Sequence, residues 1–393
     1  MEFAVVLGAL SLFAWVYLLA FHGGFWRADQ RLATTLPEPD TWPEVVVLVP
    51  ARNEVEMVGR SIACHMASAY PGRLSVILVD DQSDDGTANA ALEAAKGAPR
   101  PFSITSAPPV ASGWTGKLWA LEHGLMAARD KAPDATYVWL TDADIVHGQD
   151  VLARLVSKAE HDGLALVSVM ALLDSKGFWA GLLMPAFVFF FQKLYPFPLV
   201  NELSSGVSGA AGGCILVRRD ALDAMGGFAA IRNQLIDDCA IARKIKLGPP
   251  RRPIWLGLSQ SVHSLRDNSR LKDTWHMVSR TAFAQLHYSL LLLVGMIMAM
   301  TLLYLVPPVF VVTWPWHHDA ILGGVGFLTW SLMVIAYGPT LRLYGRHLAH
   351  GLLLPVAALL YCAMTMSSAV RQWRGHGGKW KGRIYPAPKR RSS

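Results

Sequence analysis

The chain has 393 residues, of which 52% are hydrophobic and 17% are charged, and its formal net charge is +7. This composition is too apolar for an ordinary soluble enzyme, and the charge of its middle part excludes a pure bundle of membrane helices. We therefore expect membrane segments and an aqueous domain in one chain.

The first apolar segment, Phe3 to Phe21, approaches the roughly 20 residues that cross a bilayer as a helix. No Lys or Arg precedes it, so residues 1–24 are interpreted as a retained anchor, with a cleaved signal peptide as the alternative. Arg27 and Arg31 follow closely. The positive-inside rule then predicts a multi-pass protein of the inner (plasma) membrane with its aqueous domain in the cytoplasm.

Residues 25–265 are predicted to form that domain. Short apolar runs alternate with amphipathic stretches, which is typical of an α/β fold with a mostly parallel sheet. The clearest strands are Val45–Val49, Leu74–Val79 and Tyr137–Thr141. Each run ends in polar residues, and ligands bind beyond the carboxyl ends of such strands, so we expect the three following loops to meet at one crevice.

The loop after the second of these strands is rich in aspartate. Asp80 and Asp81 end the strand, while Asp84 and Thr87 open the next helix. Carboxylates at a strand end can accept bonds from a base N–H and from ribose hydroxyls, although helix capping is an alternative role for Asp84. Lys117, further along, is a candidate partner for a diphosphate or an ordinary surface charge.

Four cysteines are present, and they are Cys64, Cys214, Cys239 and Cys362. They show neither CxxC spacing nor the density of a disulfide framework, which fits a reducing compartment. We interpret them as ordinary buried thiols.

Asp142-Ala143-Asp144 follows the third strand directly. Two carboxylates in such a turn can bind a hard divalent cation and leave positions for diphosphate oxygens. The motif alone also fits a solvated turn or a helix cap. The Asp-rich loop after the second strand favours the metal interpretation.

An aromatic stretch, Phe178 to Pro198, contains three prolines and one charge, that of Lys193. It is poorly suited to a straight transmembrane helix. We expect it to lie in the membrane interface or to line an apolar acceptor cleft, with a buried core helix as an equal alternative.

Asp237 and Asp238 precede the predicted helix Cys239–Leu247. Repulsion between adjacent carboxylates can raise one pKa toward a value suited to a general base. Charge complementing the helix dipole is the alternative.

Residues 266–286 are predicted to contain an amphipathic interfacial helix. Leu271, Trp275, Val278, Ala282 and Leu286 share one helical face, and basic side chains lie elsewhere on the helix. This pattern describes a helix on an anionic membrane surface.

Residues 287–370 hold three more apolar segments, Tyr288–Trp314, Ile321–Tyr337 and Leu352–Val370. Three full crossings would put the basic tail, residues 371–393, outside the cell, although such a tail should bind anionic phospholipids on the cytoplasmic side. Leu352–Val370, interrupted by Pro355, is therefore our candidate for a re-entrant or interfacial segment. Because the tail adjoins a membrane helix, nucleic acid is the less favoured partner. The basic residues are Arg371, Arg374, Lys379, Lys381, Arg383, Lys389, Arg390 and Arg391.

Together these motifs resemble family 2 glycosyltransferases of the GT-A fold, a class that includes ceramide glucosyltransferases, polyprenyl-phosphate sugar transferases and polysaccharide synthases. The resemblance extends from about Val45 to Arg280. More narrowly, residues 212–219, 236–239 and 380–383 resemble glycosyltransferases associated with bacterial hopanoid synthesis. The motifs that carry the family resemblance are Val49 to Glu54, Val79 to Thr87, Gly116-Lys117, Asp142 to Asp144, Gly212-Gly213-Cys214 and Asp237-Asp238.

The resemblance implies that Asp81 contacts the nucleotide base, that Asp144 binds the metal with Asp142, and that Asp238 meets the acceptor hydroxyl. The family's Glu-Asp pair is Asp-Asp here, so the assignment between Asp237 and Asp238 stays open. The nucleotide-sugar site would also include Pro50, Arg52, Glu54, Asp84, Lys117, Asp142 and Arg280, and the acceptor site Gly212, Gly213 and Trp275.

One departure from the family pattern concerns Arg280. Many relatives carry Arg-Trp near the membrane, and here only the arginine is present. We expect Arg280 to neutralise a leaving diphosphate, while the missing tryptophan disfavours processive polymer synthesis.

The sequence thus predicts an inverting glycosyltransferase that uses Mg2+ or Mn2+ to transfer a sugar from a nucleotide-diphosphate sugar to the hydroxyl of a membrane lipid, with hopanoids among the candidates. One alternative is a polyprenyl-phosphate sugar transferase, whose anionic acceptor needs no base. Another is a membrane protein that binds sugar nucleotides without chemistry, although such a protein should carry polar residues within several spans.

Overall fold

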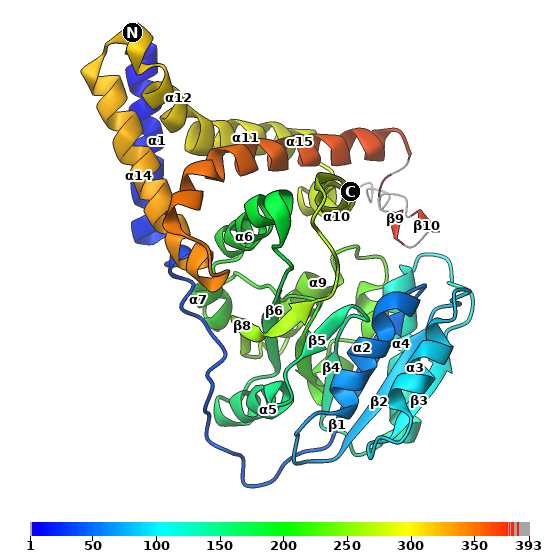
Figure 1. The fold of residues 1–393 in the computed structure, drawn as a ribbon. Helices are drawn as coiled ribbons and strands as arrows, with labels where there is room; N and C mark the ends of the chain where they lie inside the picture. The colour runs from blue at the N-terminus through cyan, green and yellow to red at the C-terminus, as the bar shows by residue number, and fades with distance from the viewer. Residues whose placement is uncertain (1, 376, 378, 381–382, 385–393) are drawn as a thin grey trace.

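One eight-stranded sheet forms the centre of the aqueous domain in the computed structural model (Figure 1), which describes residues 2–375, 377, 379–380 and 383–384. The strand order is β3-β2-β1-β4-β7-β6-β8-β5. The strands are β1 Val45–Ala51, β2 Leu74–Asp80, β3 Phe102–Ser106, β4 Tyr137–Leu140, β5 Ile145–His147, β6 Leu166–Leu172, β7 Ile215–Arg218 and β8 Ile254–Ser264. The three strands expected from the sequence are thus confirmed to within two residues.

The sheet is mixed and mostly parallel, as predicted. β1 pairs in parallel with β2 and β4, and β2 pairs in parallel with β3. β7 runs antiparallel to both β4 and β6, and β5 runs antiparallel to β8. The chain moves outward from β1 to β3 and then returns to place β4 on the other side of β1. This reversal leaves a crevice at the carboxyl ends of these strands, where α/β sheets bind ligands.

Helices cover both faces of the sheet, so β1 is buried along its whole length and has a continuous apolar sequence. α4 and α9 pack in one hydrophobic cluster, while α2, α3 and α5 pack in the other. The helices of this domain are α2 Val55–Met66, α3 Thr87–Ala95, α4 Gly116–Lys131, α5 Val151–His161, α6 Gly177–Leu194, α7 Phe197–Asn201, α8 Arg219–Ala224 and α9 Asp237–Leu247.

Five helical segments in the described part of the chain are long and apolar enough to cross a membrane. They are α1 Glu2–Phe21, α6, the segment Leu290–Val312, α14 Ala320–Leu343 and the segment Leu348–Trp373. Leu290–Val312 consists of α11 Leu290–Met300, a π-helical turn at Thr301–Leu305 and α12 Val306–Val312, which includes two prolines. The remaining helices are α10 Leu271–Gln285, α13 Trp314–His317 and α15 Leu354–Trp373.

These long helices point in two directions. α1 packs against α14, and α12 contacts both. α15 lies beside α11, and in Figure 1 both run at a steep angle to α1 and α14. Helices that are parallel in space project as parallel lines in any view, so α15 and α14 are not parallel. This arrangement favours the interfacial interpretation of Leu352–Val370, which stays a prediction.

α6 lies between the sheet and the long helices. Val188 belongs to the hydrophobic cluster beneath α4, whereas Leu183 and Phe189 belong to the cluster formed with α14 and α15. The predicted amphipathic segment forms the helix α10. Its apolar face packs against α15, and Val278 on that face is buried. The apolar side of α10 therefore faces the protein's own helices, which spacing alone did not reveal.

A short hairpin follows α15, formed by β9 Lys379–Trp380 and β10 Arg383–Ile384. Lys381, Lys389, Arg390 and Arg391 of the predicted basic tail lie outside the described residues.

We expect the end of α15 to lie on the same side of the membrane as the aqueous domain, because α15 does not continue in the direction of α14. In a cysteine-free background, Arg374→Cys should react with an impermeant thiol reagent from the side of the aqueous domain only. Trp316→Cys, in the short helix α13 between α12 and α14, is at an exposed position and is the matched control that should react from the opposite side. Labelling of both positions from one side would contradict this topology.

Candidate active site

The loops after β1 and β2 lie against each other at the carboxyl edge of the sheet. The Arg52 guanidinium lies 3.9 Å from the carboxylate of Asp81 and donates to the Asp81 carbonyl. The Asp81 side chain is fully buried, whereas Asp84 is exposed. The structure therefore buries Asp81 beside Arg52 and leaves Asp84 exposed, and their roles in nucleotide binding stay predictions.

Hydrogen bonds between the two loops explain their shape. The Glu54 N–H donates to Thr87 Oγ1 at 2.8 Å, and the Asn53 N–H donates to Ser83 Oγ at 3.0 Å. Asn53 adopts a left-handed backbone conformation with φ of 51°, which asparagine tolerates better than most residues. Pro50 is a buried residue near the end of β1, next to this loop.

Asp142 and Asp144 both lie directly after β4 and are each paired with a cation. Asp142 Oδ1 lies 2.8 Å from Lys117 Nζ, and Asp144 Oδ2 lies 2.6 Å from Arg266 Nε. Burial raises the pKa of Asp142, although Lys117 opposes this effect. The two carboxylates thus converge at the crevice with their negative charge compensated from both sides.

The sequence analysis did not identify Arg266 as a site residue. Its guanidinium also lies 2.7 Å from Glu54 Oε1, so it links the loop after β1 to the loop after β4. A basic residue two positions beyond the end of β8 was the only available signal, because the sequence does not show that β8 ends beside these loops.

Asp237 and Asp238 begin α9 and have different partners. Asp237 Oδ2 lies 3.0 Å from Lys117 Nζ. Asp238 accepts hydrogen bonds from the backbone N–H groups of Gly212, at 2.8 Å, and Cys239, at 2.7 Å. Burial, and then repulsion from Asp237, raise the pKa of Asp238 to about 6. A carboxylate with this pKa is suited to accept a proton near neutral pH.

Glycines leave room for these groups. A Cβ on Gly212 would lie 3.3 Å from Asp238 Oδ2 and 3.4 Å from Lys117 Nζ. A Cβ on Gly213 would instead meet Ile145 at 3.2 Å. Gly212 therefore contacts the charged groups directly, while Gly213 allows close packing behind them.

Two of the predicted site residues lie on α10. Arg280 is exposed and interacts electrostatically with Asp142, Asp144 and Asp237. Trp275 packs with α15, and its Nε1–H donates to Ser367 Oγ at 3.1 Å. Arg280 thus lies within electrostatic range of the carboxylates, and Trp275 is part of the contact between α10 and α15.

A cavity of about 700 Å³ is lined by residues next to the aspartate pair in sequence, although neither aspartate is among its described lining residues. Ile236 and Cys239 on its wall flank the aspartate pair in sequence. Tyr195 and Gln285, two further wall residues, are joined by a hydrogen bond of 2.7 Å from Gln285 Nε2 to the Tyr195 hydroxyl. From the aromatic stretch only Leu194 and Tyr195 line this cavity, because most of α6 is packed between layers.

The sequence model described as "Glycosyltransferase like family 2" matches residues 43–248, just over half of the chain. The chain belongs to this family. The matched range ends at the last residues of α9, so it includes all four aspartates of the two pairs. No curated protein sequence matches the chain.

Solved structures include proteins similar to this family 2 glycosyltransferase. A mannosyltransferase from Pyrobaculum calidifontis, in complex with GDP-Man and Mn2+, is 18% identical, with a TM-score of 0.55 over 94% of this chain and 98% of that one. Mannosyl-3-phosphoglycerate synthase from Rubrobacter xylanophilus is also 18% identical, with a TM-score of 0.41 over 68% of this chain and 82% of that one. The first likeness confirms the GT-A-like fold, including the long apolar helices at both ends of the chain.

The pKa of Asp238 predicts the pH dependence of transfer. A general base works as the carboxylate, so kcat/KM should be constant above the pKa of about 6 and fall about tenfold per pH unit below it. Rates measured from pH 5 to 8 would show the step. An Asp238→Asn variant should lack it, and a native profile without a step in this range would exclude Asp238 as the base.

Proposed function

We propose that the protein transfers a sugar, with inversion, from a nucleotide-diphosphate sugar to the hydroxyl of a membrane lipid at the cytoplasmic face of the membrane. The observation that carries this proposal is Asp238, a carboxylate with a raised pKa whose neighbours in sequence line a large cavity. That cavity extends to the turn that leads from α10 into the apolar helix α11, where it is lined by His287 and Tyr288.

The donor would bind where the loops after β1, β2 and β4 meet. In this proposal Asp81 would read the base, and Lys117 and Arg280 are cations suited to diphosphate oxygens. Asp142 and Asp144 offer hard oxygen donors from one turn, which suits Mg2+ or Mn2+. Each uses one oxygen in its ion pair and has a second that can face a cation, so the residues fit the metal. When bound, the ion would stabilise charge on the leaving diphosphate.

The chemical step then needs one proton acceptor. As the acceptor oxygen forms a bond to the anomeric carbon, its proton passes to Asp238 Oδ, and the bond from that carbon to the diphosphate oxygen breaks. The nucleoside diphosphate leaves with the electron pair, and the anomeric configuration inverts. Lys117 keeps Asp237 and Asp142 neutralised in the same crevice. No covalent intermediate on the protein is required.

A lipid alcohol suits the acceptor cavity because the wall combines apolar and polar groups. Leu194, Val207 and Leu247 provide apolar surface, while Tyr195 and Gln285 provide hydrogen-bonding groups near Asp238. Hopanoid and ceramide-like alcohols are the first acceptors to test in view of the motif resemblance. Mass analysis of products formed from a lipid extract and a panel of nucleotide-sugars would identify both substrates.

A polyprenyl phosphate is the second candidate acceptor, and one observation favours it. Arg243 and Lys244 line the same cavity and could pair with an anionic head group. Such an acceptor is already a nucleophile and would not need Asp238 as a base. The Asp238 variants below therefore separate the two candidates.

We expect Asp144→Asn to abolish transfer and to remove the effect of Mn2+ on donor binding, because the amide cannot supply the anionic oxygen that the cation requires. Excess chelator should stop transfer by the native protein, and added Mg2+ or Mn2+ should restore it. Asp223→Asn, which alters an exposed ion pair with Arg129, is the matched control and should behave as the native chain. Full activity in excess chelator would exclude the metal.

Asp238→Asn should lower the single-turnover rate by about 10²–10⁴-fold while the donor dissociation constant stays nearly unchanged. The amide has almost the same shape, and the donor contacts lie elsewhere. Asp237→Asn should have a smaller effect, because that carboxylate pairs with Lys117.

Rapid-quench rates and donor titration of both variants test these roles. An inactive Asp237→Asn with a near-normal Asp238→Asn would transfer the base role to Asp237. Near-normal rates in both would favour the phosphate acceptor.

A further inference from the structure

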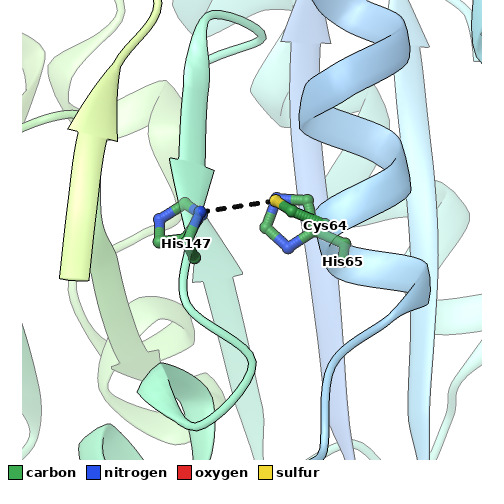
Figure 2. A group of neighbouring side chains, drawn as sticks. All are labelled: Cys64, His65 and His147. Atoms are coloured by element: carbon green, nitrogen blue, oxygen red, sulfur yellow. Dashed lines mark hydrogen bonds between the residues drawn. The ribbon is translucent and has the colours of Figure 1, made fainter.

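One thiol and two imidazoles lie close together beside Trp139, a residue of β4. Cys64 and His65 come from α2, and His147 ends β5 (Figure 2). Their candidate ligand atoms all lie within 4.8 Å of one another. Sequence spacing did not indicate this group, because Cys64 and His147 are far apart along the chain.

The two histidines are buried, and the imidazole ring of His65 has no hydrogen bond within the described part of the chain. His65 is 1% exposed and His147 is 7% exposed. Within the described part of the chain, neither ring nitrogen of His65 has a hydrogen-bond partner, whereas the ring of His147 interacts with the backbone of Gly213. Nearly all buried polar side-chain atoms in proteins have a partner, so the unpaired imidazole nitrogens of His65 in this group require an explanation.

Aromatic packing explains the ring faces but not the nitrogens. Both imidazoles make T-shaped contacts with Trp139, with ring centroids 4.8 Å away for His65 and 4.6 Å away for His147. Apolar side chains of similar size would fill this space without burying polar atoms. A ligand for the nitrogens accounts for both the residue types and their convergence.

We propose that Cys64, His65 and His147 bind a zinc ion. One thiolate and two imidazoles are a donor set that zinc favours and that Mg2+ and Mn2+ do not. With bonds of about 2.0–2.3 Å in a tetrahedron, the ligand atoms would lie about 3.3–3.8 Å apart, so the side chains need to approach by about 1 Å. The fourth position can be taken by water, because Cys64 is only half-buried.

The backbone around Cys64 supports this role. The His147 N–H points to Cys64 Sγ at 3.4 Å, and such a donor would stabilise the thiolate (Figure 2). The Cys64 thiol now donates to the Ser61 carbonyl at 3.0 Å, and its proton would be released on metal binding. Cys64 is therefore assigned a role beyond that of an ordinary buried thiol.

The site would hold the short strand β5 against α2. β5 has three residues and ends the strand order of the sheet, where it pairs with β8. It directly follows Asp144, while α2 directly follows Glu54. A zinc ion would thus tie together the two segments that lead into the donor site, and its role would be structural and distinct from the cation at Asp142 and Asp144.

Metal analysis of the full chain tests the proposal. The protein is purified in detergent without chelators or a histidine tag, and its zinc content is measured by mass spectrometry before and after dialysis against Zn2+. We expect about one zinc ion per chain, retained in Cys362→Ser and lost in Cys64→Ser and His147→Gln. Zinc-free protein should melt at a lower temperature and recover with Zn2+ but not with Mg2+.

Cobalt provides a test that is independent of stability. Co2+ bound at this site should show thiolate-to-metal charge-transfer absorption that disappears in Cys64→Ser, a conservative change at a half-buried position. A native chain that takes up no stoichiometric Zn2+ or Co2+ would overturn the proposal. Metal content or a cobalt spectrum unchanged in Cys64→Ser would also overturn it, even if His147→Gln failed to fold.

Discussion

The charge balance at Lys117 is the interaction on which the rest of the site depends. Its ammonium group lies between Asp142, which follows β4, and Asp237, which begins α9. Burial opposes the charge on Lys117, but the two carboxylates outweigh it and raise its pKa, so the lysine stays protonated. Without this cation, carboxylates from both segments would face one another in one crevice, and repulsion would favour protonation or separation. Arg266 has the corresponding role between Asp144 and Glu54.

This balance separates the roles of two adjacent aspartates. Asp237 is neutralised by Lys117, whereas Asp238 is held by two backbone N–H groups and experiences the repulsion of its neighbour. Different surroundings can suit similar groups to different tasks, and these surroundings support the proposal that Asp238 accepts the proton. Gly212 is part of this arrangement, because its missing side chain lets the backbone approach both Asp238 and Lys117.

Local patterns predicted the strands and the residues at their ends. Polar residues that follow apolar runs were predicted to meet at one site, since parallel strands bring such ends together, and these residues include Asp81, Asp142 and Asp144. Arg266 did not follow, because its ion pairs depend on where β8 ends in space. Spacing on α10 identified an apolar face but not its partner, and that partner is α15. The grouping of Cys64 with His147 likewise depends on the packing of α2 against β5, which no short motif records.

The acceptor cavity is shared between the two parts of the molecule. α9 supplies one wall from the aqueous domain, while Tyr195 at the end of α6 and Gln285 at the end of α10 supply another from the layer beneath the long helices. α6 contacts both the sheet and those helices, so it holds the two walls in one geometry. Gln285 lies at the end of α10, and α10 packs against α15, so the position of this wall depends on the long helices. Under the proposed function, these helices would therefore help to shape the acceptor cavity, because displacement of α15 would displace the wall that contains Gln285.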